Sequence, residues 1–265
     1  MSADAPPLLW HIPLSHFNEK VRWALDYKHI AHRRQVLGPD YLIRAWRATG
    51  QGKLPILFLD GRAIADSTRI IAALEERFPD PPLYPRDGDA RQRALALEDF
   101  FDEGLGPAAR AAIVTPLFRH DPDIALRVLT TGMPAKAYET LRPLRRVFPA
   151  FYRLRHKISE AKLEQDRATV TAALDRIDSE RQGRPYLVGD AFTVADLTAS
   201  ALVGPLLQPP EIQYPLQVEL PSYIQEYRSR LLPHPTVQWA AEIYRRHRGV
   251  SAEIPRGDKG TPAAA

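Results

Sequence analysis

The stretch LLWHIPLSHFNEKVRWAL, residues 8–25, decides how the first part of the chain folds. Its apolar run from Leu8 to Ile12 predicts a buried strand. Apolar residues then recur at helical spacing, at Phe17, Val21, Ala24 and Leu25. Ser15 therefore stands where a strand ends and a helix begins. Such a position suits either a structural cap or an anion, because a helix N-terminus presents unpaired N–H groups and partial positive charge.

The next segments extend this pair into a small sheet. RRQVL, residues 33–37, predicts a second strand, and YLIRAWRA after Asp40 predicts a short helix. LPILFLDGRAIA, residues 54–65, contains two apolar runs joined by Asp60-Gly61, which is a strong hairpin signal. A right-handed crossover makes the first two strands parallel. The hairpin then completes a mixed sheet of four strands.

The helix DSTRIIAALEERF closes this unit, with Asp66 or Ser67 as its cap. The order βαβαββα is that of a thioredoxin-like α/β domain, and helical patterns alone follow it. We therefore predict an all-α C-terminal domain. The predicted boundaries are 1–79 for the first domain, 80–90 for a Pro- and Asp-rich linker, 91–248 for the helical domain with an enlarged 107–158 segment, and 249–265 for a disordered tail.

The amino-acid composition excludes several kinds of site. The chain of 265 residues has a net charge of +4 and no cysteine, so disulfides, thiolate zinc sites and a protein thiol nucleophile are excluded. Its eight histidines form no strong metal-ligand spacing, so we expect no metal. We find no signal-peptide pattern and no apolar run of membrane-spanning length. We expect a cytoplasmic protein that binds neither membrane nor nucleic acid.

Three ordered motifs carry a family resemblance. SHFNEKVRWAL, GKLPIL and ADSTRIIAALEERFP follow one another within the first eighty residues. A fourth, YLVGDAFTVADLTASALV at 186–203, holds a capping box of Thr193 and Asp196. In this order they resemble the cytosolic glutathione transferases. Taken one at a time, Ser15, Pro55 and Ser67 also have ordinary structural explanations, as two caps and a strand start.

The resemblance implies a site for glutathione as co-substrate. Pro55 would be cis and leave the Leu54 backbone free to pair with the cysteinyl backbone of glutathione. Ser67, at its helix N-terminus, would bind the γ-glutamyl carboxylate, and Asp66 would offset the γ-glutamyl ammonium. Lys53 is the best candidate for the glycyl carboxylate.

Ser15 would point its hydroxyl at the glutathione sulfur. A hydroxyl-to-thiolate hydrogen bond contributes about 1.5–3 kcal/mol, and the helix N-terminus adds about 0.3–1 kcal/mol. Because about 1.4 kcal/mol changes a pKa by one, these terms would make a thiol of ordinary pKa about 8.5 largely thiolate at neutral pH. The substrate then supplies the nucleophile, which fits a chain without cysteine.

The residue at position 15 resembles the serine-type classes such as tau, theta and zeta, rather than the cysteine-type omega and beta classes. His16 departs from the tau-like pattern, which has proline there. Asn18 lies one turn into the helix and could be a second donor to the sulfur. His16 and Asn18 are therefore either accessory residues that tune the thiolate or part of a solvated first turn.

The family's co-substrate pocket lies between the helical domain and the loop after the first strand. We therefore expect Pro13, Leu14 and Phe101 to line it, although a helical aromatic is more often core. The segment RPLRRVFPAFYRLRHK, residues 142–157, interleaves basic and aromatic side chains. It is either a solvated helix face, a surface for nucleic acid or an acidic partner, or a cover over the pocket.

The sequence thus predicts a homodimeric glutathione S-transferase of the detoxification type, which transfers the glutathione thiolate to small, mostly apolar electrophiles. Two alternatives use the same fold. One is a non-catalytic binding or scaffold protein, which the basic insert favours. The other is a glutathione-dependent disulfide reductase or isomerase. The sequence does not identify the electrophile.

Overall fold

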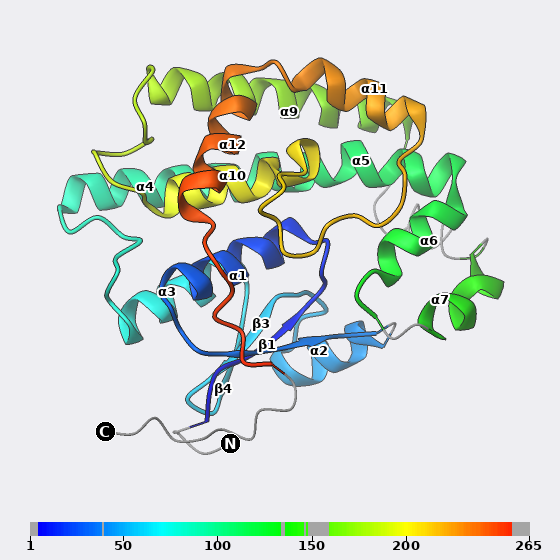
Figure 1. The fold of residues 1–265 in the computed structure, drawn as a ribbon, viewed down its shortest axis with the longest axis horizontal. Coiled ribbons are helices and arrows are strands. Elements are labelled where there is room, and N and C mark those ends of the chain that lie inside the picture. The colour runs from blue at the N-terminus through cyan, green and yellow to red at the C-terminus, as the bar shows by residue number, and fades with distance from the viewer. Residues whose placement is uncertain (1–4, 39, 134–135, 146, 148–158, 256–265) are drawn as a thin grey trace.

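The computed structural model describes residues 5–38, 40–133, 136–145, 147 and 159–255. Its first part is a small sheet with helices on both faces, and its second part is helical (Figure 1). This confirms the predicted fold class. The elements of the first part are β1 (Leu8–His11), α1 (His16–Tyr27), β2 (Arg33–Val36), α2 (Tyr41–Thr49), β3 (Ile56–Leu59), β4 (Arg62–Ala65) and α3 (Ser67–Arg77).

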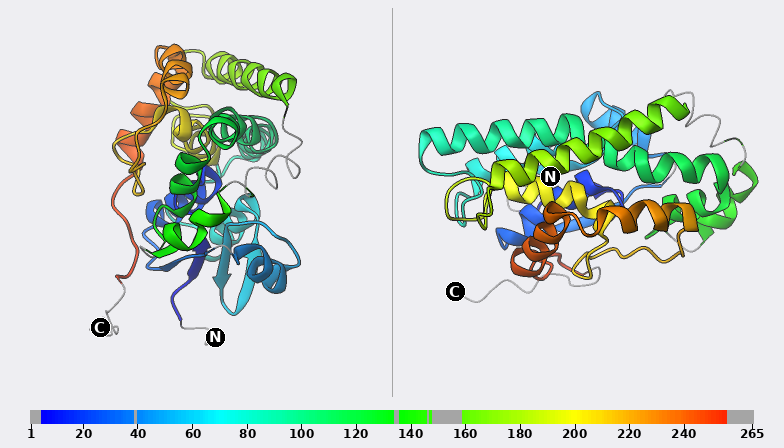
Figure 2. Two further views of the ribbon diagram at one scale, coloured as in Figure 1. Left: turned by 90° about the vertical axis from the view of Figure 1, so that its right-hand side faces the viewer. Right: turned by 90° about the horizontal axis from the view of Figure 1, so that it is seen from above.

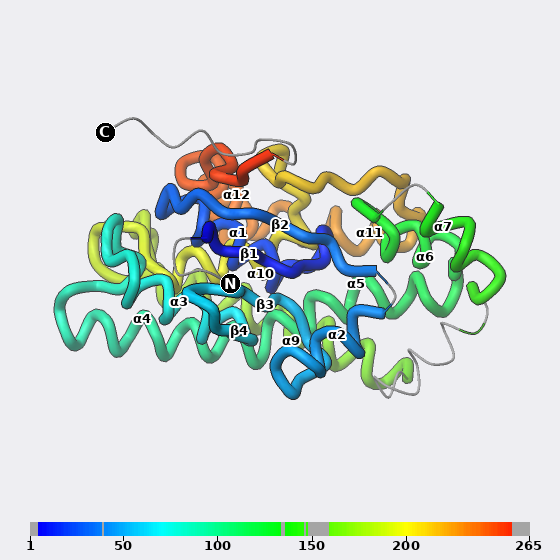
Figure 3. Tube along the Cα trace, turned by 90° about the horizontal axis from the view of Figure 1, so that it is seen from below, coloured from blue at the N-terminus to red at the C-terminus, as the bar shows by residue number. Residues whose placement is uncertain are grey.

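The sheet has the strand order β2-β1-β3-β4, which Figure 3 shows from below. β1 pairs with β2 in parallel, and β3 is antiparallel to both β1 and β4. The hairpin between β3 and β4 turns at Asp60 and Gly61, with φ angles of 48° and 78°. Asn, Asp and Gly tolerate this left-handed region best, and so the Asp-Gly pair specifies the turn.

Each face of the sheet packs against different helices. Leu9 and Leu57 point into the main core with α1 and α3. Their neighbours Trp10 and Ile56 point to the other face and pack with Ala45 of α2. This alternation is the period of two expected of a strand that is covered on both sides.

The helical part begins at Gly88, inside the predicted 80–90 linker. A π-helical turn, η1, joins the first two helices without a break. Much of the 142–157 basic segment, namely Arg146 and residues 148–157, lies outside the described residues. The elements are α4 (Gly88–Phe100), η1 (Phe101–Leu105), α5 (Gly106–His120), α6 (Pro122–Thr130), α7 (Lys136–Leu141), the 3₁₀ turn η2 (Arg142–Leu144), α9 (Glu160–Arg181), α10 (Val194–Leu207), α11 (Ser222–Leu231) and α12 (Pro235–His247).

Helix α10 lies at the centre of the helical part and is buried along most of its length. The predicted capping box at its start is present: Asp196 accepts from the Thr193 N–H at 2.8 Å. α10 packs on α1 from one side and on α4, α5 and α12 from others. One continuous core therefore joins the two domains, and α1 is enclosed between the sheet and α10.

The C-terminal segment after α12 returns to the sheet (Figure 2). Glu253 forms a parallel bridge with His32, and the Ile254 N–H donates to the His32 carbonyl at 2.8 Å. The expectation of a disordered tail from residue 249 is thus wrong for residues 249–255, because they pair with the chain just before β2. Residues 256–265 lie outside the described residues.

Candidate functional site

The register of the sheet brings the predicted site residues to one edge. Trp10 at the end of β1 lies opposite Ile56 at the start of β3, and Ile56 lies opposite Ala65 at the end of β4. The loop that carries Ser15, the residues before β3 and the start of α3 therefore meet at the same end of these strands. The three motifs that were found separately in the sequence form one constellation.

Ser15 is the N-cap residue of α1, with φ −79° and ψ 123°. Its side chain, which is partly exposed, makes no capping hydrogen bond. Its backbone is held on both sides, since its N–H donates to the Ile12 carbonyl at 3.2 Å and its carbonyl accepts from the Glu19 N–H at 2.8 Å. The capping interpretation of the serine hydroxyl is therefore wrong, and within the described residues the hydroxyl remains available to a ligand.

The peptide bond between Leu54 and Pro55 is cis, as the resemblance implied. Among the described residues, the Leu54 backbone makes no backbone hydrogen bond. Lys53 is exposed beside it and forms no ion pair with the described part of the chain. A free backbone unit next to a free cation would suit an extended peptide that ends in a carboxylate.

Asp66 caps α3. Its φ is 80°, an uncommon value for a residue other than glycine, and its Oδ1 accepts from the N–H groups of Thr68 and Arg69 at 3.1 and 3.3 Å. Ser67 is buried as the first residue of the helix, and its hydroxyl makes no hydrogen bond with the described residues. The cap is thus Asp66, and the Ser67 side chain is left for another partner at the positive end of α3.

His16 and Asn18 do not face water. His16 is 5% exposed, and burial together with the nearby Arg110 charge lowers its pKa to about 3. Asn18 is fully buried, and its Oδ1 accepts from the Ile12 N–H at 3.3 Å. The expectation of a solvated first turn is wrong because α1 is covered on that side by the helical domain. His16 is neutral at physiological pH, and Asn18 supports the loop that precedes Ser15.

A buried ion cluster beneath the site was missed by sequence reasoning. Lys20 of α1 has no exposed side-chain surface, and its Nζ lies 2.7 Å from Glu98 and 2.6 Å from Asp102. The Thr68 hydroxyl, one residue after Ser67, donates to Asp102 at 2.7 Å. Burial raises the pKa of Glu98, and Lys20 opposes this shift. The cluster ties α1 and α3 to the helical domain directly under the start of α3.

The expected co-substrate residues divide into two groups. Pro13 and Leu14 lie in the loop before Ser15, and the turn after α6 packs against this loop at Gly132. A Cβ on Gly132 would lie 2.7 Å from Pro13 Cγ, so this approach requires glycine. Phe101 has no exposed surface and belongs to the main core, which favours its structural interpretation. The middle of the enlarged 107–158 segment, at Gly132, therefore reaches the loop of Ser15.

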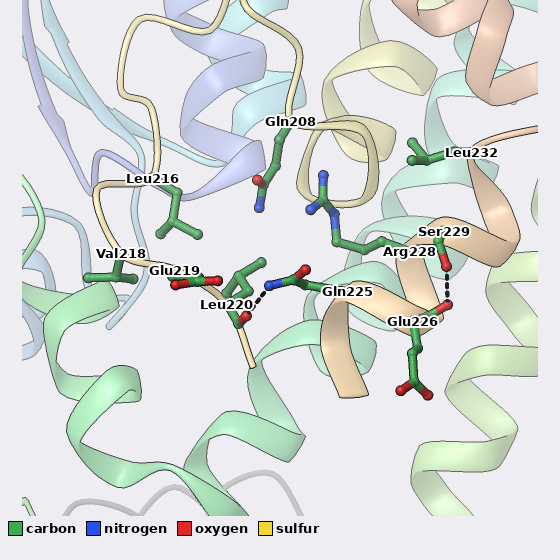
Figure 4. A pocket seen from close by; sticks show the side chains of 10 residues that line it. All are labelled: Gln208, Leu216, Val218, Glu219, Leu220, Gln225, Glu226, Arg228, Ser229 and Leu232. Carbon is green, nitrogen blue, oxygen red and sulfur yellow. Dashed lines mark hydrogen bonds between the residues drawn. The ribbon is translucent and has the colours of Figure 1, made fainter. Parts of the chain in front are cut away.

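Two cavities lie away from this constellation. The first, about 580 Å³, lies between the 208–220 loop and α11 (Figure 4). Arg228, which lines it, donates to the carbonyls of Leu206 and Leu207. The second, about 470 Å³, includes Lys28 and Asp80 at the other end of the sheet. Neither includes any of the predicted site residues.

The described ranges contain no group of three or more acidic, histidine or cysteine side chains that would hold a metal ion. In the same ranges, none of the helices has both the length and the apolar content needed to span a bilayer.

Comparison with known proteins agrees with the two-part fold and identifies related families. The family models described as "Glutathione S-transferase, N-terminal domain" and "Glutathione S-transferase, C-terminal domain" match residues 9–82 and 141–235. A probable maleylacetoacetate isomerase of Caenorhabditis elegans is 30% identical over 108 residues, which are 40% of this chain and half of that protein. A probable glutathione S-transferase of Nicotiana tabacum is 24% identical over 197 residues, which are 74% of this chain and 67% of the tobacco protein.

Solved structures share the fold. A glutathione S-transferase from Methylobacterium radiotolerans in complex with glutathione sulfonate is 24% identical, with a TM-score of 0.56 over 89% of this chain and 95% of that one. A β-etherase from Sphingobium is 18% identical, with a TM-score of 0.59 over 90% of this chain and 99% of that one. Both domain models match in order, and the fold is shared over 89–90% of the chain. The chain therefore belongs to the cytosolic glutathione S-transferase superfamily.

Proposed function

We propose that this protein binds glutathione at the sheet edge and holds its sulfur as thiolate beside the Ser15 hydroxyl. The observation that carries the proposal is the unpaired hydroxyl of Ser15 at the N-terminus of α1, on the same edge as Pro55 and Ser67. The Ser15 hydroxyl makes no hydrogen bond with the described residues, so its O–H can donate to an anion, and the helix N-terminus favours the same charge.

The rest of glutathione would follow the free groups along that edge. The Leu54 backbone would pair with the cysteinyl backbone, and Lys53 would bind the glycyl carboxylate. Ser67 and the start of α3 would bind the γ-glutamyl carboxylate, with the exposed Asp66 carboxylate near its ammonium. Each of these groups is free, or partly free, within the described residues.

The proposed reaction is transfer of the thiolate to a small, mostly apolar electrophile. The sulfur lone pair forms a bond to an electron-poor carbon, and a leaving group departs with its bonding electrons, or a proton completes an addition. Leu14, which is partly exposed, would contact the electrophile, and the buried Pro13 would support it from beneath. We also propose a homodimer in the cytoplasm, and gel filtration tests the dimer.

A second candidate is glutathione-dependent isomerisation of a carbon–carbon double bond. The similarity to the nematode protein, a probable maleylacetoacetate isomerase, favours it. The thiolate would add to one alkene carbon, rotation would follow about the new single bond, and expulsion of the thiolate would restore glutathione. The same Ser15 hydroxyl would serve both reactions, because both begin with a thiolate.

Calorimetry with glutathione and a conjugation assay on matched variants test the proposal. Ser15→Ala should leave the Kd within about threefold and lower kcat by about tenfold to a hundredfold, the equivalent of one charge-assisted hydrogen bond. Ser67→Ala should instead raise the Kd, because it removes a binding group remote from the sulfur. Absence of glutathione binding by the wild type overturns the proposal. Equal turnover by wild type and Ser15→Ala overturns the role of Ser15.

A further inference from the structure

A buried arginine, Arg22, forms hydrogen bonds with the backbone of the loop from Ile12 to Ser15. Arg22 of α1 has no exposed surface. Its Nη2 donates to the Pro13 carbonyl at 2.8 Å, and its Nη1 lies 3.4 Å from the Ile12 carbonyl and 3.0 Å from His11 Nδ1. One planar guanidinium thus contacts three consecutive residues at the end of β1.

Arg22 is itself fixed in place. Glu19 Oε2 accepts from its Nε and Nη2 at 3.0 and 2.8 Å, and the Tyr214 ring lies with its centroid 4.8 Å from the guanidinium carbon. A carboxylate on the edge and an aromatic ring on the face leave the group little freedom. Its remaining donors are therefore directed at the loop carbonyls.

The charges around Arg22 come from several elements. Glu19 on α1 balances it, and Arg34 on β2 and Arg248 after α12 lie in the same buried network, with Asp26 between them. His11 on β1 must accept at Nδ1. Burial and the neighbouring arginines lower its pKa to about 2, which keeps the ring neutral. The contact with Arg22 is thus maintained across the physiological pH range.

Asn18 holds the same loop from the other direction. Its Oδ1 accepts from the Ile12 N–H, while the Ile12 carbonyl accepts from the Ser15 N–H at 3.2 Å. The Ile12 N–H is therefore bonded to Asn18, which is buried in α1, and the Ile12 carbonyl is bonded to the Ser15 N–H within the loop. The orientation of Ser15 follows from the position of Ile12.

We propose that Arg22 and Asn18 are positioning residues, which clamp the Ile12–Ser15 loop so that the Ser15 hydroxyl is aimed at the sulfur. This inference rests on the proposed function, because Ser15 must act on a bound thiolate for its aim to matter. Both side chains are buried and bond the loop backbone, so we infer that they act on the Ser15 hydroxyl through the loop. Loss of either should misplace the hydroxyl and leave the carboxylate-binding groups at Lys53 and Ser67 intact.

The test compares Arg22→Lys and Asn18→Ala with the wild type and with Arg34→Lys as a matched control. Lysine keeps the charge but cannot reach two carbonyls and Glu19 together. Arg34 is equally buried and lies in the same charged network, bonded to Asp26 and His32 without contacting the loop. Glutathione affinity by calorimetry, the ultraviolet absorbance of the bound thiolate and the pH profile of kcat are measured for each.

Both clamp variants should bind glutathione within about threefold of the wild type, while their pH profile moves to higher pH. A rise of one in the apparent pKa of the thiol lowers kcat about tenfold on the acidic limb. Arg34→Lys should be less stable than the wild type but should keep the wild-type pH profile of kcat. If Arg22→Lys does not fold, Asn18→Ala decides alone, because it removes a single acceptor.

Three results would overturn the clamp, and one of them would also overturn the proposed function. A wild type that does not bind glutathione removes the proposed function and this inference with it. Normal binding with profiles that coincide for Asn18→Ala, Arg22→Lys and the wild type removes the clamp alone. A shift of equal size in Arg34→Lys also removes it, because the effect would then follow general loss of the buried network.

Discussion

Glu19 on α1 accepts a hydrogen bond at 2.5 Å from the Nε of Arg248, although 229 positions separate the two residues. Both side chains are buried, and Arg248 also donates to Asp26 at 3.0 Å. The Ala252 N–H reaches the other oxygen of Asp26 at 2.8 Å. The end of the helical domain is therefore fastened to the helix that begins at Ser15.

Replacement of Arg248 by methionine should lower the free energy of unfolding by about 3–5 kcal/mol, because it leaves two buried carboxylates short of a partner. Arg245→Met, on the exposed side of α12, is the control and should cost about 0–1 kcal/mol. Urea denaturation measures both. Equal losses in the two variants would mean that the buried contacts of Arg248 contribute no more than a surface ion pair.

The cluster under α3 allows a sharper comparison. Lys20→Met should cost about 3–5 kcal/mol, since it leaves Glu98 buried without its cation. The double variant Lys20→Met/Glu98→Gln removes both charges and should recover much of that loss. Chemical denaturation at pH 7 reports the difference. A double variant as unstable as Lys20→Met would show that packing around Lys20, rather than its charge pairing, sets the cost.

The close approach of the α6–α7 turn to the Ser15 loop is tested at a glycine. Gly132 has φ 74°, and a Cβ there would meet Pro13 at 2.7 Å. Gly183 has φ 75° with nothing within 4 Å, so Gly183→Ala carries the backbone cost alone, about 1–2 kcal/mol. Gly132→Ala should cost about 1–3 kcal/mol more, through overpacking against the loop. Thermal denaturation of both variants checks this, and equal losses would contradict the contact.

Local patterns predicted those parts of the fold that depend on local residues. The Asp60-Gly61 turn, the Thr193 capping box and the helix after Asp66 all depend on residues within a few positions of each other, and all three are present. The parallel pair and the antiparallel hairpin followed from one crossover and one turn signal, whereas no local pattern placed β3 beside β1. The site motifs met because strand register places their ends together.

What the sequence did not predict depends on partners far along the chain. Helix α1 carries charged residues on the face opposite its apolar stripe, a face that a surface helix would expose. The structure buries that face against the helical domain, and pairs Lys20 with Glu98 and Glu19 with Arg248. Only the tertiary arrangement specifies such pairs, so periodicity does not indicate them. The pairing of Glu253 with His32 is of the same kind.

The buried histidine next to Ser15 predicts loss of stability in acid. The pKa of His16 is lowered from 6.5 to about 3, first by burial and then by Arg110 on α5. Between those values the unfolded chain binds a proton that the folded chain does not, so stability falls as the pH decreases below about 6.5. The slope for one such group is about 1.4 kcal/mol per pH unit, which amounts to about 2 kcal/mol at pH 5.

His16→Gln removes this term, and its stability relative to the wild type should therefore improve steadily from pH 7 to pH 5. His120→Gln makes the same substitution at an exposed position and is the control. Urea denaturation at several pH values measures both differences, and a constant difference for His16→Gln would show that His16 takes up its proton in the folded protein as it does in the unfolded chain.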